Sequence, residues 1–142
     1  MKQSVLIVLG LLLLPHWAAA GDVAPGLWEL SLEASVESAP GFAPGPMAVN
    51  QCFSKADAAD PAKFLAAVET TAAGDCTFTD RTYVGDTFRF RMVCEGTLHL
   101  QTSGEITFSA TTLNGVVLTS AALDGKAVEF KSVLRGRRLG DC

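Results

Sequence analysis

Four cysteines are the residues whose type and spacing most directly predict chemistry in this sequence of 142 residues. Cys52, Cys76, Cys94 and Cys142 all follow an apolar segment at the N-terminus. No Cys-x-x-Cys pair occurs, and His99 is the only histidine beyond that segment, so a zinc site lacks ligands. In an exported chain, four cysteines favour two disulfide bonds. We therefore expect disulfides, and neither a metal site nor a cofactor.

Conventional catalytic groups are sparse. A serine or cysteine nucleophile needs a neighbouring base, and the only one available is His99, which the strand pattern places on the surface. Glu29 and Glu33 share one strand face, whereas paired glycosidase carboxylates must converge across a cleft. No glycine-rich phosphate loop opens a helix. An enzyme of the cell envelope is therefore the least favoured function.

Asp80 is the residue that breaks the hydrophobic pattern. It is expected on the same apolar face as Phe78, opposite Phe90. A lone buried carboxylate is costly, so Asp80 needs a partner or must be neutral. It either contacts a ligand or lies near the open end of the domain, bonded to Thr82 or Thr102, and the second interpretation is favoured.

The segment from Cys76 to Cys94 predicts a disulfide-linked β-hairpin. Apolar and polar residues alternate on both sides of Gly85, which is the period of a half-buried strand. An odd-length loop centred on Gly85 places Cys76 opposite Cys94, whereas a two-residue loop slips the register by one and separates the sulfur atoms. We therefore expect a Cys76–Cys94 bond, which leaves Cys52 to pair with Cys142.

Eight strands and one short helical excursion are expected. Ser54 and Asp57 form a capping-box pattern, and the helix must break or restart at Pro61. Turns are expected at residues 102–104, at Asn114-Gly115 and at Asp124-Gly125. The expected strands are 27–36, 47–53, 76–83, 87–94, 97–102, 105–112, 115–123 and 127–135.

The turns keep one face of the successive strands apolar, which predicts an antiparallel meander curled into a closed or incomplete barrel. These turns set Phe108 opposite Ala121 and Thr119 opposite Phe130. A barrel of this size holds side chains or one small ligand. The residues expected to line such a ligand site are Asp80, Trp28, Phe90, Phe108 and Phe130.

The N-terminus has the three parts of a secretory signal peptide. Lys2 precedes an apolar run from Val5 to Leu14, and small residues end the segment at Ala20. The run is too short for a transmembrane anchor, because a span needs roughly twenty residues. We expect cleavage after Ala20, which leaves residues 21–142 as a single domain.

The net charge of −4 makes nucleic-acid binding unfavourable.

Two surface features could meet a partner. Arg135, Arg137 and Arg138 crowd the C-terminus and could contact lipid headgroups or anionic glycans, although pairing with neighbouring acidic residues is favoured.

The strand at 115–123 is apolar on its outward side as well as its inward side, through Val116, Leu118 and Ala122. That outward side needs a cover, which could be the helix at residues 61–68 or a second subunit in a homodimer.

Motifs at both ends of the chain resemble those of domain-of-unknown-function family 3617. They are Pro25-Gly26-Leu27-Trp28-Glu29 near the start and the closing stretch from Gly136 to Cys142, with Gln51-Cys52, Cys76 and Cys94 between them. That family consists of small exported proteins, mostly of Gram-negative bacteria, so the resemblance implies a periplasmic location and no particular activity. The leading hypothesis is a non-enzymatic domain that binds a small apolar ligand or an envelope component. The alternative is a structural or protein-interaction module with a filled core.

Overall fold

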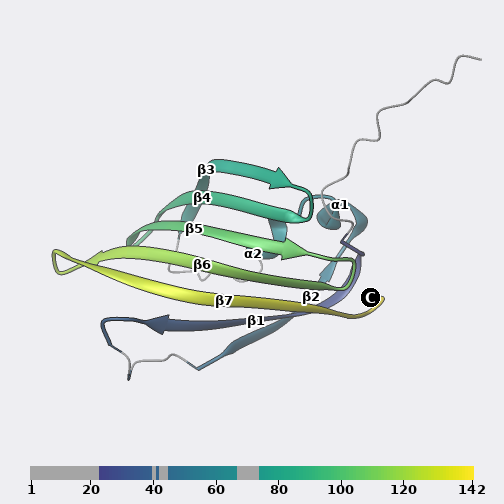
Figure 1. Ribbon diagram of the computed structural model, residues 1–142, viewed down its shortest axis with the longest axis horizontal. Coiled ribbons are helices and arrows are strands. Elements are labelled where there is room, and N and C mark those ends of the chain that lie inside the picture. The colour runs from purple at the N-terminus through teal and green to yellow at the C-terminus, as the bar shows by residue number, and fades with distance from the viewer. Residues whose placement is uncertain (1–22, 40, 42–44, 67–73) are drawn as a thin grey trace, which may run out of the picture.

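The computed structural model describes residues 23–39, 41, 45–66 and 74–142, so the predicted signal peptide lies outside the described residues. The described chain forms one antiparallel sheet in the order β2-β1-β7-β6-β5-β4-β3, with two one-turn helices between β2 and β3 (Figure 1). The strands are β1 (Gly26–Val36), β2 (Met47–Phe53), β3 (Asp75–Val84), β4 (Thr87–Glu95), β5 (His99–Phe108), β6 (Thr112–Leu123) and β7 (Lys126–Gly140). The helices are α1 (Lys55–Ala58) and α2 (Lys63–Ala66).

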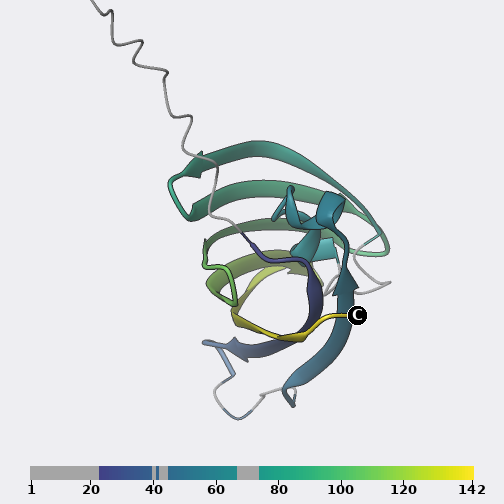
Figure 2. The same cartoon turned by 90° about the vertical axis from the view of Figure 1, so that its right-hand side faces the viewer.

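The sheet curls into an open half-barrel. Figure 2 shows the strands as arcs around a common axis, and the two edge strands, β2 and β3, are not paired with each other. Each successive pair from β3 to β7 is antiparallel, and β1 joins the sheet between β7 and β2. The predicted mainly β meander with an incomplete barrel is confirmed, with seven described strands in place of eight.

The β3–β4 hairpin places the cysteines opposite each other by a different route from the predicted one. Val84 pairs with Thr87, so the loop has two residues, and Gly85 adopts a φ of 60° there. A bulge between Phe78 and Asp80 adds one residue to β3 and reverses the alternation. The loop and the bulge each shift the register by one, so Cys76 still faces Cys94.

Two predicted turns are wrong, because their glycines lie inside strands. Residues 102–104 belong to β5, which pairs with β4 along its length, and Asn114-Gly115 belongs to β6. A Cβ on Gly104 would come within 2.8 Å of the Phe90 ring, and one on Gly115 within 2.7 Å of the Ile106 side chain. Both positions therefore require glycine for reasons of packing. In the sequence, such a strand glycine cannot be told from the glycine of a turn.

Of the two remaining turns between β5 and β7, one lies where the sequence predicted it and the other does not. Asp124-Gly125 forms the predicted β6–β7 turn, with φ values of 50° and 74°, and Thr119 faces Phe130 as expected. The β5–β6 turn lies at residues 109–111, so Phe108 faces Leu113 and not Ala121. The hydroxyl of Ser109 stabilises this turn by accepting hydrogen bonds from the backbone N–H groups of Thr111 and Thr112.

The helical segment covers part of the concave face. The capping box is present, and hydrogen bonds from Ser54 and from Lys63 together lower the pKa of Asp57 to about 2. The chain restarts after Pro61, and Phe64 of α2 is fully buried. Its ring packs against those of Trp28, Phe53 and Phe108 at centroid distances of 5.1, 4.0 and 5.8 Å. Phe64 thus fixes α2 on the inside, so the described part of the 61–68 helix does not cover the outward side of β6.

Candidate functional site

An apolar cavity of about 370 Å³ lies on the concave face of the half-barrel. Inward-facing residues of β1, β3, β4, β5, β6 and β7 form its walls, and Leu65 of α2 lines it on the helical side. Its described lining residues are Leu32, Ala34, Leu65, Cys76, Met92, Cys94, Leu100, Thr102, Val117, Thr119, Phe130, Ser132 and Leu134. Aliphatic side chains therefore supply most of the surface that a bound molecule would contact.

Three hydroxyl groups interrupt this apolar lining. Thr102 of β5 and Thr119 of β6 are register partners, and their hydroxyl oxygens lie 3.2 Å apart in a hydrogen bond. Ser132 of β7 faces Val117 and is 9% exposed, while Thr102 is 7% exposed. These two are the only buried polar residues in the described part of the chain.

The expected aromatic lining is largely absent from the cavity. Phe130 lines it, but Trp28 and Phe108 pack around Phe64, and Phe90 stacks on Phe88 with ring centroids 5.4 Å apart. Aromatic rings thus fill one part of the interior and leave the aliphatic part hollow. The sequence signal for the real lining was the strand alternation, which puts Thr102, Thr119 and Ser132 on the apolar face.

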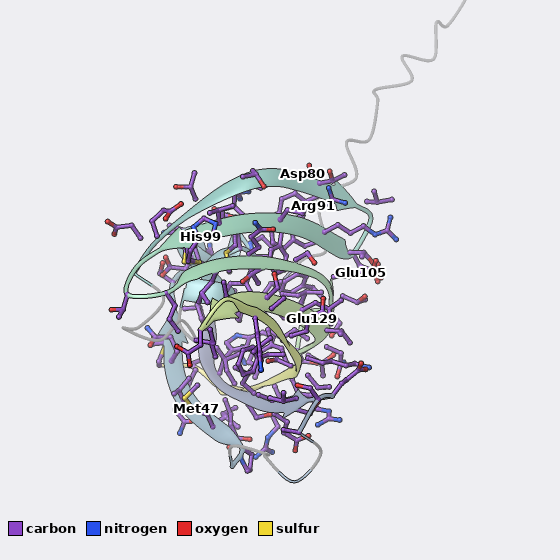
Figure 3. All side chains as sticks on the ribbon, turned by 90° about the vertical axis from the view of Figure 1, so that its left-hand side faces the viewer. Met47, Asp80, Arg91, His99, Glu105 and Glu129 are labelled. Atoms are coloured by element: carbon purple, nitrogen blue, oxygen red, sulfur yellow. A yellow bond between two sulfur atoms is a disulfide. The ribbon has the colours of Figure 1, made fainter. Side chains whose placement is uncertain are left out.

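Asp80 is exposed and lies on the outer side of the sheet. Because of the bulge before it, Asp80 pairs in register with Arg91, and the predicted position opposite Phe90 is wrong. Figure 3 shows Asp80 and Arg91 on the outside of the edge strand and its neighbour. Arg81 is the residue that faces Phe90, and its guanidinium lies 4.9 Å from the centre of the Phe78 ring. The apparent buried carboxylate is therefore a consequence of the unpredicted bulge.

Asp60 links the helical segment to the edge strand β3. Its Oδ1 atom accepts hydrogen bonds from Arg81 Nη2 at 2.9 Å and from the Tyr83 hydroxyl at 3.2 Å. The Tyr83 ring stacks on Phe88 with a centroid distance of 4.6 Å. Burial raises the pKa of Tyr83, the Arg81 hydrogen bond opposes that rise, and the Asp60 charge adds to it. The helical cover is thus tied to β3 as well as to the interior.

The predicted arginine patch is largely paired. Arg135 contacts Glu33 at 3.2 Å, and Arg137 contacts Glu29 at 2.8 Å across the β1–β7 pair. The Arg137 hydrogen bond lowers the pKa of Glu29. Arg138 turns away from the other two and is less exposed than either. The arrangement agrees with the favoured interpretation, in which these arginines pair with neighbouring acidic residues.

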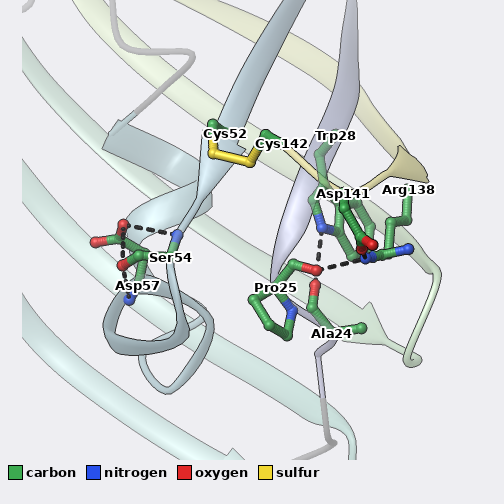
Figure 4. The surroundings of a disulfide bond; sticks show 9 residues. All are labelled: Ala24, Pro25, Trp28, Cys52, Ser54, Asp57, Arg138, Asp141 and Cys142. Atoms are coloured by element: carbon green, nitrogen blue, oxygen red, sulfur yellow. Dashed lines mark hydrogen bonds and ion pairs between the residues drawn. A yellow bond between two sulfur atoms is a disulfide. The ribbon is translucent and has the colours of Figure 1, made fainter.

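Arg138 joins the two ends of the domain (Figure 4). Its Nε donates a hydrogen bond to the carbonyl oxygen of Pro25 at 2.8 Å, and its Nη2 contacts Asp141. The Trp28 ring nitrogen donates to the carbonyl oxygen of Ala24 at 3.0 Å in the same region. Residues of the two terminal sequence motifs therefore meet in a structural contact, outside the cavity lining.

Both expected disulfides are present. Cys76–Cys94 joins neighbouring strands, and both its residues line the cavity. Cys52–Cys142 connects the end of β2 to the C-terminus (Figure 4). The first bond fixes a wall of the cavity, and the second holds the last residues of the chain against the early part of the sheet.

The outer face carries a second depression, of about 530 Å³. Its lining mixes apolar, charged and hydroxyl side chains, and includes Leu118, Arg91, Glu129 and Lys131. Leu118 is 53% exposed, and the neighbouring Val116 is 41% exposed. His99 is also exposed and lies 3.0 Å from Glu95.

The described residues contain neither a metal-binding cluster nor a membrane-spanning helix. No group of three or more histidine, cysteine or acidic residues among them is placed to hold a metal ion. Within the same part of the chain, neither helix has the length and apolar character needed to cross a membrane.

The fold and the site define a class: a small, disulfide-bonded antiparallel half-barrel with an apolar cavity on its concave face. The family model described as "Protein of unknown function (DUF3617)" matches residues 23–142, and the chain belongs to this family. The resemblance seen in the terminal motifs and cysteines is thereby confirmed. Comparisons with curated proteins and with solved structures found no match.

Proposed function

We propose that this protein binds a small apolar molecule in the cavity of its half-barrel, after export to the periplasm. The observation that carries the proposal is the cavity itself. Its volume of about 370 Å³ lies within the usual range of small-molecule sites, and its walls are mainly aliphatic. The cavity is open to solvent on the concave face of the half-barrel, so a ligand can enter it.

The surroundings of the cavity support a maintained site. Both residues of the Cys76–Cys94 bond line it, and Leu65 lines its helical side on α2, which the buried Phe64 anchors. Asp60 ties the same segment to β3. Covalent, aromatic and polar contacts therefore connect the elements that line the cavity. A preorganised site of this kind loses less conformational entropy when a ligand binds.

Export is supported by the cysteine chemistry and by the N-terminal sequence. Two disulfides suit an oxidising compartment, and residues 1–20 have the pattern of a secretory signal peptide. N-terminal sequencing of the exported protein is expected to begin at Gly21. Retention of the first twenty residues would contradict this part of the proposal.

A matched pair of variants tests the binding site. Val117 faces the cavity, whereas the adjacent Val116 faces outward. Val117→Phe should fill the space, and Val116→Phe adds the same ring to the outer face. Naphthalene is a suitable apolar probe, with binding followed by its fluorescence and by titration calorimetry. We expect binding by the wild type and by Val116→Phe, and a loss of at least tenfold in affinity for Val117→Phe.

Thermal unfolding of each variant provides the control for folding. If Val117→Phe unfolds, Ala34→Leu offers a smaller filling change at another position of the wall. Absence of naphthalene binding by the folded wild type contradicts the proposal. Equal binding by the wild type and by a folded cavity-filled variant contradicts it as well.

A second candidate function is an interaction surface on the outer side of β6. The exposed Val116 and Leu118 favour it, because they form an apolar strip beside a depression. The partner that this candidate function requires is a second copy of the chain. Sedimentation velocity should then show a dimer that Leu118→Glu converts to a monomer, and a wild-type monomer at high concentration would rule this candidate out.

A further inference from the structure

The polar groups of the cavity form one patch on three neighbouring strands. Thr102 of β5 pairs with Thr119 of β6, and Thr119 pairs with Phe130 of β7. Ser132 lies two residues further along β7, on the same face of the strand, so its hydroxyl is diagonal to that of Thr119. The three hydroxyls therefore converge on one region of an otherwise apolar wall.

Ser132 has hydrogen-bonding capacity available to a ligand. Ser132 lines the cavity, and no hydrogen bond joins its Oγ to another residue that the structure describes. A molecule in the cavity would therefore meet the Ser132 hydroxyl at this wall.

The threonine pair adds a second available donor. A hydroxyl has one proton and two lone pairs. One proton is used in the hydrogen bond between Thr102 and Thr119, so the other threonine keeps its own. Together with Ser132, the patch can donate to and accept from the same group of a bound molecule.

None of the described lining residues carries a charge. A carboxylate, phosphate or ammonium group held against these residues would give up part of its water without gaining an opposite charge from them, which is unfavourable. Neutral hydroxyls compensate such a loss only weakly. The chain as a whole is acidic, with a net charge of −4, which disfavours anions further.

We infer that the cavity selects an uncharged amphiphile: a short apolar chain or ring that bears one hydroxyl or amide group, bound by Thr102, Thr119 and Ser132. This inference rests on the proposed function and names the ligand class of the same site. At roughly 30 Å³ for each water-sized group, the volume admits about a dozen non-hydrogen atoms. Medium-chain alcohols and amides therefore have the appropriate size.

Probes that share a chain and differ in the head group test the selection. Titration calorimetry at pH 8 would compare 1-octanol with octanoate and octylammonium, which are both charged at that pH. Naphthalene serves as the apolar probe without a head group. For the wild type we expect 1-octanol to bind at least tenfold more tightly than either ion.

A variant without the hydroxyls separates head-group recognition from apolar burial. In Thr102→Val/Thr119→Val/Ser132→Ala, each replacement keeps a similar shape, and the threonine pair is removed together so that neither partner is left unsatisfied. We expect its affinity for 1-octanol to fall about tenfold, while its affinity for naphthalene stays within twofold. Ser132→Ala alone should lower the affinity for 1-octanol about threefold and is the variant to use if the triple variant does not fold.

The outcomes distinguish this inference from the proposed function. If naphthalene binds but octanoate equals 1-octanol, the cavity is a site and the selection for neutral ligands is wrong. If naphthalene binds and loss of the hydroxyls leaves 1-octanol unchanged, recognition by these three residues is wrong. If the folded wild type binds none of the probes, both are overturned.

Discussion

The guanidinium of Arg138 and the carbonyl oxygen of Pro25 are joined by a hydrogen bond of 2.8 Å between residues 113 positions apart in the chain. This bond joins the last residues of strand β7 to the start of strand β1, where Gly26 has a φ of 140°. A Cβ on Gly26 would lie 2.7 Å from Arg138 Nη2, so the two residues approach closely only because one is glycine. Within this contact, the terminal motifs of the sequence act as parts of the fold.

Replacing Arg138 with lysine should destabilise the domain. A lysine ammonium lacks the planar fork that reaches Pro25 and Asp141 together. We expect a loss of about 1–2 kcal/mol in the free energy of unfolding, measured by urea denaturation. Arg137→Lys is the matched control, since Arg137 is largely exposed, and its effect should stay within about 0.5 kcal/mol. Equal effects for both variants would contradict the structural role of Arg138.

The two disulfides should differ in their contribution to stability. Cys52–Cys142 closes a sequence separation of 90 residues, and Cys76–Cys94 one of 18. In the chain-entropy model these loops correspond to about 4.6 and about 3.2 kcal/mol. Cys52→Ser/Cys142→Ser should therefore lower the free energy of unfolding more than Cys76→Ser/Cys94→Ser. Peptide mapping without reduction checks the pairing, and a Cys52–Cys76 linkage would contradict it.

Tyr83 provides a spectroscopic measure of the Asp60 contact, because it is the only tyrosine in the chain. Burial raises its pKa above the ordinary value of 10.0, so its phenol should ionise at a higher pH than in the unfolded chain. The stabilisation linked to this group is complete below about pH 10 and is lost as the pH rises through the folded-state pKa.

Asp60→Asn removes a negative charge beside the phenol and should lower the pKa of Tyr83 toward its ordinary value. Ultraviolet absorption during alkaline titration measures both proteins. An unchanged titration curve in the variant would show that the contact between Asp60 and Tyr83 does not persist in solution.

Gly104→Ala should destabilise the sheet. The new Cβ would lie 2.8 Å from the Phe90 ring and 2.8 Å from the carbonyl oxygen of Val116, and that backbone atom has little freedom to move. We expect a loss of about 1–3 kcal/mol in chemical denaturation. Gly45→Ala has no atom within 4 Å of its new Cβ and is the control. A Gly104→Ala protein as stable as the control would contradict the continuous β5 strand.

The same glycine explains where sequence reasoning succeeded and where it failed. Strand alternation and the four cysteines predicted the meander and both disulfides. Gly104 and Gly115 were assigned to turns. In the sequence, a strand glycine that makes room for a large neighbouring side chain looks the same as a turn glycine. The bulge at residue 79 left no signal, and missing it reversed the expected direction of Asp80.

The candidate site was predicted in its general place and not in its composition. Aromatic residues were expected to line it, but Phe64 from the helical segment occupies the space between Trp28 and Phe108. Which part of an apolar face stays hollow depends on how side chains from distant segments fill it, and a strand pattern does not contain that information. Only Phe130 among the expected ligand residues lines the cavity.

Native mass spectrometry of the mature protein, purified from the periplasm without detergent, tests the central claim most directly. We predict a population of wild-type and Val116→Phe protein that carries one small non-covalent adduct, and its absence from a folded Val117→Phe protein. Reloading the stripped protein with 1-octanol should restore an adduct in the first two proteins only. If the wild-type protein shows only its bare mass before and after incubation with 1-octanol and naphthalene, the cavity is not a ligand site.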